Sequence, residues 1–177
     1  MENMMNNNLE PQIAIARGIF SKMPDELFND YLKPLICDIG NWPFQTCYDI
    51  TYGTDWDRLF CVVSMPELAS CSWALGSFTP TLANITQQSL GDIGQLLQNY
   101  IGTLPRLLRN YDYDYCRAST AYHMQELKEK GSFTQPVVLY PINGRFHVMD
   151  GNHRIAAALL LSNLGQSFTI PAWMAKV

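Results

Sequence analysis

The sequence predicts an α+β fold, in which a small mixed β-sheet is joined to an N-terminal helical extension. Three observations in the last third of the chain lead to this prediction. Apolar runs at 135–140 and 145–149 flank Asn143-Gly144, which is a strong signal for a tight β-hairpin. A helical pattern at 119–130 precedes the hairpin, and a third apolar run follows at 168–174. We therefore expect the order helix, strand, hairpin, strand, helix, strand in this part of the chain.

The N-terminal part is expected to carry most of the additional helices. Residues 1–10 predict a disordered leader, because the start of the chain is polar and rich in asparagine. Residues 11–118 are expected to form the helical part and the first strands of the sheet. Met23-Pro24-Asp25-Glu26 predicts a helix start, since proline suits the first turn and carboxylates suit the positive end of the helix dipole. Pro34 is expected to kink or interrupt this helix.

The middle of the chain is interpreted from its composition. Residues 41–58 are aromatic and turn-rich and predict a loop or hairpin, whereas the short apolar run 59–63 predicts a buried strand. Residues 71–78 fit either a strand or a loop. Apolar side chains at helical spacing predict a helix within 84–109, and residues 111–115 are expected to form an exposed, acidic, aromatic loop.

The charge of the chain is unevenly distributed. The net charge is −4, but residues 1–100 carry 4 basic and 11 acidic side chains (4 − 11 = −7), whereas residues 101–177 carry 8 basic and 5 acidic ones (8 − 5 = +3). All three histidines also lie in the second part. An anionic ligand is therefore expected to bind there. The alternative is an uneven distribution without a functional meaning.

Two classes of protein are excluded by simple patterns. No stretch approaches the about 20 apolar residues that span a bilayer, and the first residues lack the pattern of a signal peptide. None of the five cysteines forms a CxxC pair, so a structural zinc site is not expected. The sequence predicts a cytoplasmic protein with free thiols and no membrane span.

The segment 119–177 contains a turn that suggests a phosphate-binding site. The turn is formed by Asp150, Gly151, Asn152, His153 and Arg154. A strand is expected to end before it, and a helix is expected to begin at Asn152 or His153. The first N–H groups of a helix attract anions, glycine lets an anion approach, and arginine binds phosphate through two donors. Asp150 is interpreted as a general base or magnesium ligand, or else as an N-cap or partner of Arg154. The alternative is an ordinary connection with an N-cap and a surface arginine.

Residues 131–138 and 143–158 resemble the N-terminal domain of ParB-type proteins and sulfiredoxins, which share a Gly-x-x-Arg turn after a hairpin. This resemblance implies a ParB/sulfiredoxin-type sheet and a phosphate site that includes Gln135 with Gly151 to Arg154. It also implies ATP or CTP with Mg²⁺ as the ligand. Members of the superfamily that these residues resemble carry out CTP hydrolysis, sulfinic acid reduction with ATP, serine phosphorylation, nuclease activity and plasmid fertility inhibition.

Two departures narrow what the resemblance implies. Sulfiredoxins have a cysteine where this chain has Asn152, so sulfinic acid reduction is not expected. Partition proteins continue into a DNA-binding helix-turn-helix domain, and since the sequence ends at Val177 a sliding DNA clamp is not expected either.

Two further residues are possible members of the site. Glu126 could act as a base or metal ligand near the nucleotide, but a solvated helix face shared with Lys128 and Lys130 is the preferred interpretation. His147 could point into the site or be a half-exposed strand residue.

We expect an enzyme, either a nucleoside triphosphatase (ATPase) or a metal-dependent DNase, in plasmid or phage biology. Asp150, His153 and Arg154 are the expected catalytic residues, and Asp150 is the expected metal ligand. A nucleotide is the expected partner, with DNA as a further substrate. The alternative is a non-catalytic nucleotide sensor or inhibitor that docks on a partner protein.

Overall fold

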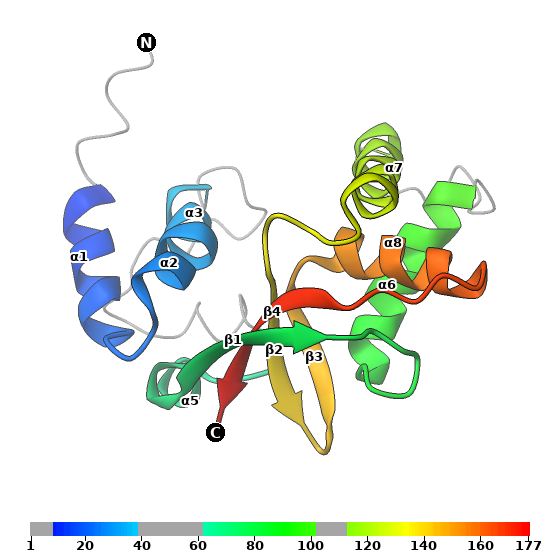
Figure 1. The fold of residues 1–177 in the computed structure, drawn as a ribbon. Coiled ribbons are helices and arrows are strands. Elements are labelled where there is room, and N and C mark those ends of the chain that lie inside the picture. The colour runs from blue at the N-terminus through cyan, green and yellow to red at the C-terminus, as the bar shows by residue number, and fades with distance from the viewer. Residues whose placement is uncertain (1–8, 39–61, 102–112) are drawn as a thin grey trace, which may run out of the picture. The chain divides into compact units, whose positions relative to one another are not determined.

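Residues 9–38, 62–101 and 113–177 are described by the computed structural model of the chain (Figure 1). The predictions for 1–8, for 39–61 and for 102–112 therefore lie outside the described residues. The chain divides into two compact units, one formed by residues 1–73 with 176–177 and the other by residues 74–175.

The first unit is mainly helical in its described part. Its elements are α1 (Leu9–Ile19), α2 (Asp25–Leu27), the π-helical turn η2 (Phe28–Leu32), α3 (Lys33–Asp38) and α5 (Met65–Ser70). Leu9 and Glu10 are thus helical, although they fall in the predicted leader. The helix after Pro24 begins as predicted and runs through Pro34 to Asp38. The chain changes to π-helical bonding just before Pro34, whose missing N–H removes one donor from the α-helical ladder.

The buried strand predicted at 59–63 is wrong for its described residues, since Val62 and Val63 form a bend. They precede Ser64, which caps α5: the Glu67 N–H donates to the Ser64 hydroxyl at 3.4 Å, and the Ser64 N–H donates to the Glu67 carboxylate at 3.0 Å. This capping box, with Pro66 in the first turn, starts a helix where an apolar run alone suggested a strand.

The sheet is mixed, as predicted (Figure 1). Its four strands lie in the order β1 (Ser72–Phe78), β4 (Ile170–Lys176), β2 (Val137–Ile142) and β3 (Arg145–Asp150). β2 pairs antiparallel with β3 and parallel with β4. Asn143 and Gly144 have φ values of 49° and 76° in the connecting turn, which confirms the predicted hairpin. Of the two interpretations of residues 71–78, the strand is correct.

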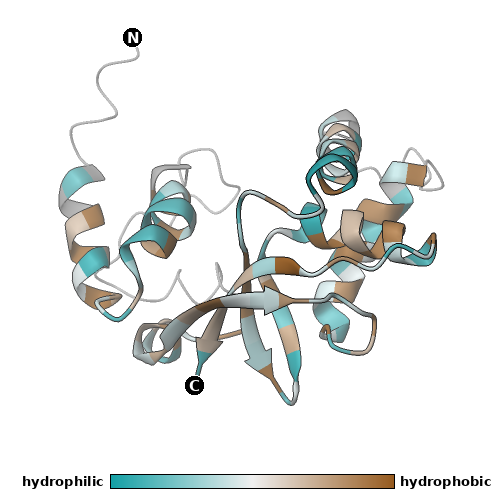
Figure 2. Cartoon of the chain, in the orientation of Figure 1, coloured by the Kyte–Doolittle hydropathy of each residue, from teal (hydrophilic) through white to brown (hydrophobic). Residues whose placement is uncertain are grey.

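Three helices pack with this sheet in the second unit: α6 (Gln87–Ile101), α7 (Tyr113–Lys130) and α8 (Asn152–Asn163). α8 is hydrophobic over most of its length (Figure 2), and Ile155 to Leu159 are buried. They share a core with Val137 and Leu139, which alternate along β2 and so lie on one face of the sheet. This packing fixes the first turn of α8 against the start of β2.

The predicted loop at 111–115 is wrong for its described part, because Tyr113 to Tyr115 form the first turn of α7. No glycine or proline interrupts the sequence from Tyr113 to Lys130, and packing of α7 against α8 and α6 favours the longer helix. The helix ends at Gly131, as predicted, where φ is 74° and the Gly131 N–H donates to the Leu127 carbonyl at 2.8 Å.

The predictions of no membrane span and of free thiols can be compared with the described residues. None of the helices in the described ranges combines the length and apolar character that a membrane crossing requires. Cys71, the cysteine whose side chain is described, is buried and free.

Candidate functional site

The turn between β3 and α8 has the form that the sequence predicts. Gly151 is the N-cap residue in a left-handed conformation (φ 96°, ψ 25°), and α8 begins at Asn152. A Cβ atom at Gly151 would lie 2.6 Å from Val137 Cγ1 and 3.0 Å from Arg154 Nε, so only glycine fits both the backbone and the space. The first helical bond runs from the Ile155 N–H to the Gly151 carbonyl, at 2.9 Å. The preceding N–H groups have no acceptor within the helix and form the positive end of its dipole.

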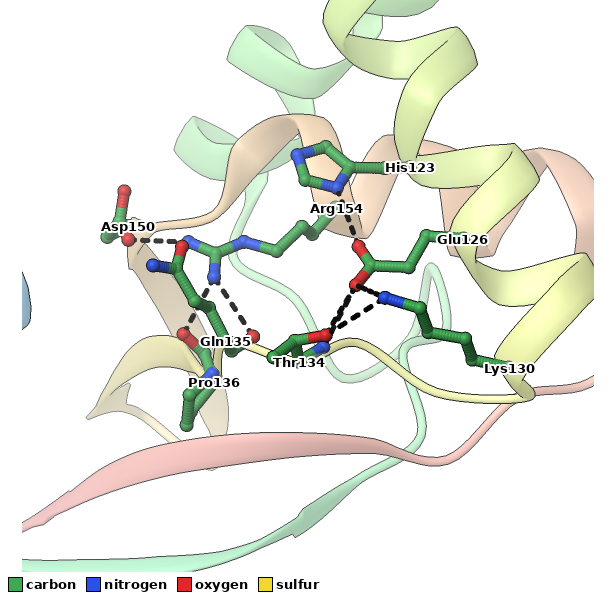
Figure 3. A network of polar contacts seen from close by, with 8 residues as sticks. All are labelled: His123, Glu126, Lys130, Thr134, Gln135, Pro136, Asp150 and Arg154. Atoms are coloured by element: carbon green, nitrogen blue, oxygen red, sulfur yellow. Dashed lines mark hydrogen bonds and ion pairs between the residues drawn. The ribbon is translucent and has the colours of Figure 1, made fainter.

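Arg154 is buried in this turn rather than on the surface, which contradicts the simpler alternative for the motif. Its guanidinium donates to the carbonyls of Gln135 and Pro136, both at 3.0 Å, and to the Asp150 carboxylate at 2.6 Å (Figure 3). Asp150 is therefore the partner of Arg154 and does not cap α8, since the N-cap residue is Gly151 and no side chain makes a cap hydrogen bond. These bonds use three of the five N–H donors of the guanidinium and join the start of β2 to the start of α8.

Asn152 and His153 each present a buried polar atom that has no hydrogen-bond partner, namely Oδ1 of Asn152 and Nε2 of His153. Buried polar atoms nearly always have partners, so these two atoms in one helical turn are exceptions to that rule. Burial lowers the pKa of His153, as do the nearby His123 and Arg154, against the opposing effect of Asp150. The ring is therefore expected to be neutral at pH 7.

Glu126 is buried, which contradicts the preferred prediction of a solvated helix face. Its Oε1 accepts from the Thr134 N–H at 3.1 Å, from the Thr134 hydroxyl at 2.8 Å and from Lys130 Nζ at 3.3 Å. Its Oε2 lies 3.3 Å from Nδ1 of His123 (Figure 3). The segment after Gly131 folds back onto α7 and encloses this carboxylate. Glu129 is exposed and accepts a hydrogen bond from Gln125, so it lies on the solvent-facing side of α7.

The surroundings of Glu126 keep it ionised. Burial alone would raise its pKa, but hydrogen bonds from Thr134, His123 and Lys130 outweigh it and lower the pKa to about 2. A carboxylate with so low a pKa is a poor general base at neutral pH. The contacts of Glu126 instead join the segment before β2 to α7 and orient His123.

A pocket of about 320 Å³ joins these parts of the site. Side chains from α7, from the segment before β2 and from α8 line it: Tyr122, His123, Glu126, Thr134, Gln135 and Arg154. His123, Tyr122 and Thr134 were not among the site residues expected from the sequence. The spacing of His123 and Glu126, three residues apart in a helix, was the available signal for their contact.

His147 fits neither of its two predicted placements. It is buried on β3, and its Nδ1 lies 2.9 Å from the hydroxyl of Ser89 on α6. Ser89 is completely buried and also accepts from the Val148 N–H at 2.9 Å. Burial lowers the pKa of His147, with an opposing effect from Asp92. Since neither residue lines the pocket, this serine–histidine pair joins α6 to β3 as a structural contact.

The described ranges contain no group of three histidine, cysteine, aspartate or glutamate side chains placed to hold a metal ion. Asp150 has a nearly half-exposed side chain and is the carboxylate within the turn. Mg²⁺ commonly binds through one or two carboxylates together with phosphate oxygens, so Asp150 could serve as a ligand only alongside a bound phosphate.

Comparison with known proteins adds no assignment: no family model matches the chain, and neither a curated protein nor a solved structure gives a significant match.

Proposed function

We propose that this protein binds the phosphates of a nucleotide at the first turn of α8 and hydrolyses a phosphate bond there, as a nucleoside triphosphatase or a metal-dependent DNase. The observation that carries the proposal is the pocket in which Arg154 of this turn meets His123 and Glu126 of α7. The resemblance of the turn to ParB-type proteins and sulfiredoxins agrees with this proposal, and it is the source of ATP or CTP with Mg²⁺ as the expected ligand.

The residues of the turn are suited to a phosphate group. The N–H groups that begin α8 point to the N-terminal end of the helix, and Gly151 supplies the left-handed backbone turn that precedes them. Arg154 retains two donors beyond those that bind Asp150, Gln135 and Pro136. A phosphate that takes over part of the Asp150 contact would release this carboxylate to bind Mg²⁺ beside the phosphate.

A nucleotide panel tests the proposal. ATP, CTP, GTP and ADP with Mg²⁺ are added to the protein, and the melting temperature is measured together with phosphate release and nicking of plasmid DNA. A nucleotide present at about 100 times its dissociation constant is expected to stabilise the fold by about 2.7 kcal/mol. We expect a clear rise in melting temperature with at least one nucleotide, and turnover with that nucleotide or with DNA. Absence of a shift with all four would contradict nucleotide binding.

The Arg154–Asp150 ion pair favours a second candidate, a non-catalytic nucleotide sensor or an inhibitor that docks on a partner protein. In this case the arginine acts as an internal structural contact, because Asp150 already neutralises its charge. Tight nucleotide binding without phosphate release or DNA nicking would support the sensor. Absence of any nucleotide binding, together with a stable protein complex, would support the inhibitor.

A further inference from the structure

Several ionisable groups among the described residues line or border the pocket, and of these His123 is placed to accept a proton. Arg154 is a permanent cation and carries no acceptor. Glu126 has its oxygens engaged by Thr134, Lys130 and His123. Asp150 is bound to Arg154 and does not line the pocket. His123 does line it, and one of its two ring nitrogens remains for a ligand.

The ring of His123 is held in one orientation. Its Nδ1 faces the Glu126 carboxylate at 3.3 Å, and because an ionised carboxylate can only accept, Nδ1 carries the proton of the neutral ring. Tyr122 and Phe133 contact the ring edge to face, with centroids 5.2 and 5.5 Å away. Nε2 therefore keeps its lone pair and lies on the side of the ring away from Glu126 (Figure 3). A histidine oriented by a carboxylate in this way is a common arrangement for a general base.

Burial keeps the ring of His123 neutral. Burial lowers the pKa of His123 and Arg154 on α8 lowers it further, whereas Glu126 on α7 and Asp150 on β3 oppose them. His153 on α8 is close enough that its own pKa responds to His123. Burial dominates, so Nε2 is available as a base at neutral pH.

We propose that His123 Nε2 is the proton acceptor for hydrolysis of a phosphate ester or anhydride in this pocket, with Glu126 as its positioning residue. This inference rests on the proposed function and deepens it. The oxygen of a water molecule forms a bond to phosphorus as a water proton moves to Nε2. The bond from phosphorus to the leaving oxygen breaks, its electron pair stays on that oxygen, and the proton passes from Nε2 to it. The proton acceptor therefore comes from α7 and not from the Asp150–Arg154 turn.

Two measurements on the full chain test the role of His123. The first is ¹⁵N NMR of the imidazole rings at neutral pH, which is tractable because the chain has only three histidines. We expect His123 as the neutral tautomer with the proton on Nδ1. A proton on Nε2, or an imidazolium at neutral pH, would overturn the proposal whether or not any variant folds.

The second measurement is hydrolysis of the nucleotide that the panel identifies, as a function of pH. His123→Gln is expected to lower turnover by about 100-fold while the dissociation constant changes little, since a general base contributes about 10² to 10⁴ in rate. Glu126→Gln is expected to move the acid limb of the profile to lower pH, because the lost negative charge no longer stabilises the protonated ring. Glu129→Gln on the same helix is the matched control, and its profile is expected to be unchanged.

The outcomes separate this inference from the proposed function. Nucleotide binding with full turnover in His123→Gln would overturn the role of His123 and leave the proposed function intact. Binding without turnover in the wild-type protein would also overturn it. Absence of binding in the wild-type protein would refute the proposed function itself, and the role of His123 with it.

Discussion

Replacing Arg154 with alanine is expected to lower the free energy of unfolding by about 3 kcal/mol. The substitution removes a buried guanidinium and leaves the carbonyls of Gln135 and Pro136 without their donor. It also removes the cation that neutralises Asp150, although that carboxylate can be hydrated because its side chain is nearly half exposed. Urea unfolding followed by circular dichroism measures the loss.

Arg145→Ala is the matched control for this experiment. Arg145 is exposed at the hairpin and starts β3, so removing it deletes the same charge without a buried contact. Its effect is expected to stay within about 0.5 kcal/mol. An Arg154→Ala variant as stable as Arg145→Ala would show that the guanidinium does not join β2 to α8.

Acid is expected to destabilise the protein through Glu126. The pKa of Glu126 is about 2 in the folded chain, against an ordinary value of 4.5 in the unfolded chain. Above pH 4.5 the carboxyl group is therefore ionised in both the folded and the unfolded chain, and its full contribution to stability is present. As the pH falls from 4.5 towards 2, the unfolded chain binds the proton first and the contribution is lost. A difference of this size corresponds to about 3 kcal/mol. Denaturant unfolding at a series of pH values measures the loss.

Comparison of two variants isolates this effect from those of the other carboxylates. Glu126→Gln cannot lose the contribution and is expected to show a shallower fall in stability between about pH 5 and about pH 3 than the wild-type protein. Glu129→Gln, which removes an exposed carboxylate from the same helix, is expected to follow the wild-type curve. Parallel curves for wild type and Glu126→Gln would be incompatible with a depressed pKa at Glu126.

The parts of the fold that depend on neighbouring residues could be predicted from the sequence. Asn143-Gly144 allows positive φ at two successive positions, which is what the hairpin turn requires. Gly131 ends α7, and Gly151 precedes the first residue of α8, for the same local reason. The mixed sheet follows from these boundaries, but its specific membership of the ParB/sulfiredoxin type remains a prediction.

The parts that depend on distant contacts could not be predicted in the same way. Glu126 precedes two lysines on a polar helix, and it is buried because Thr134 folds back onto it eight residues later. His147 alternates along β3 as expected, but its partner is Ser89 on a helix 58 residues earlier. The role of His123 depends on both the carboxylate of Glu126 and the pocket, so the helical spacing of the two residues does not indicate this role by itself.

The central claim, that phosphate binds at the first turn of α8, is tested most directly by calorimetric titration of MgATP and MgCTP into two aspartate variants. Asn152→Asp places a negative charge at the proposed phosphate site, where it also complements the helix dipole, whereas Asn163→Asp places the same charge at the exposed far end of α8. We expect Asn152→Asp to weaken nucleotide binding by at least about tenfold through charge repulsion, and Asn163→Asp to leave it unchanged. Equal nucleotide affinity of the wild-type protein and Asn152→Asp would contradict the claim.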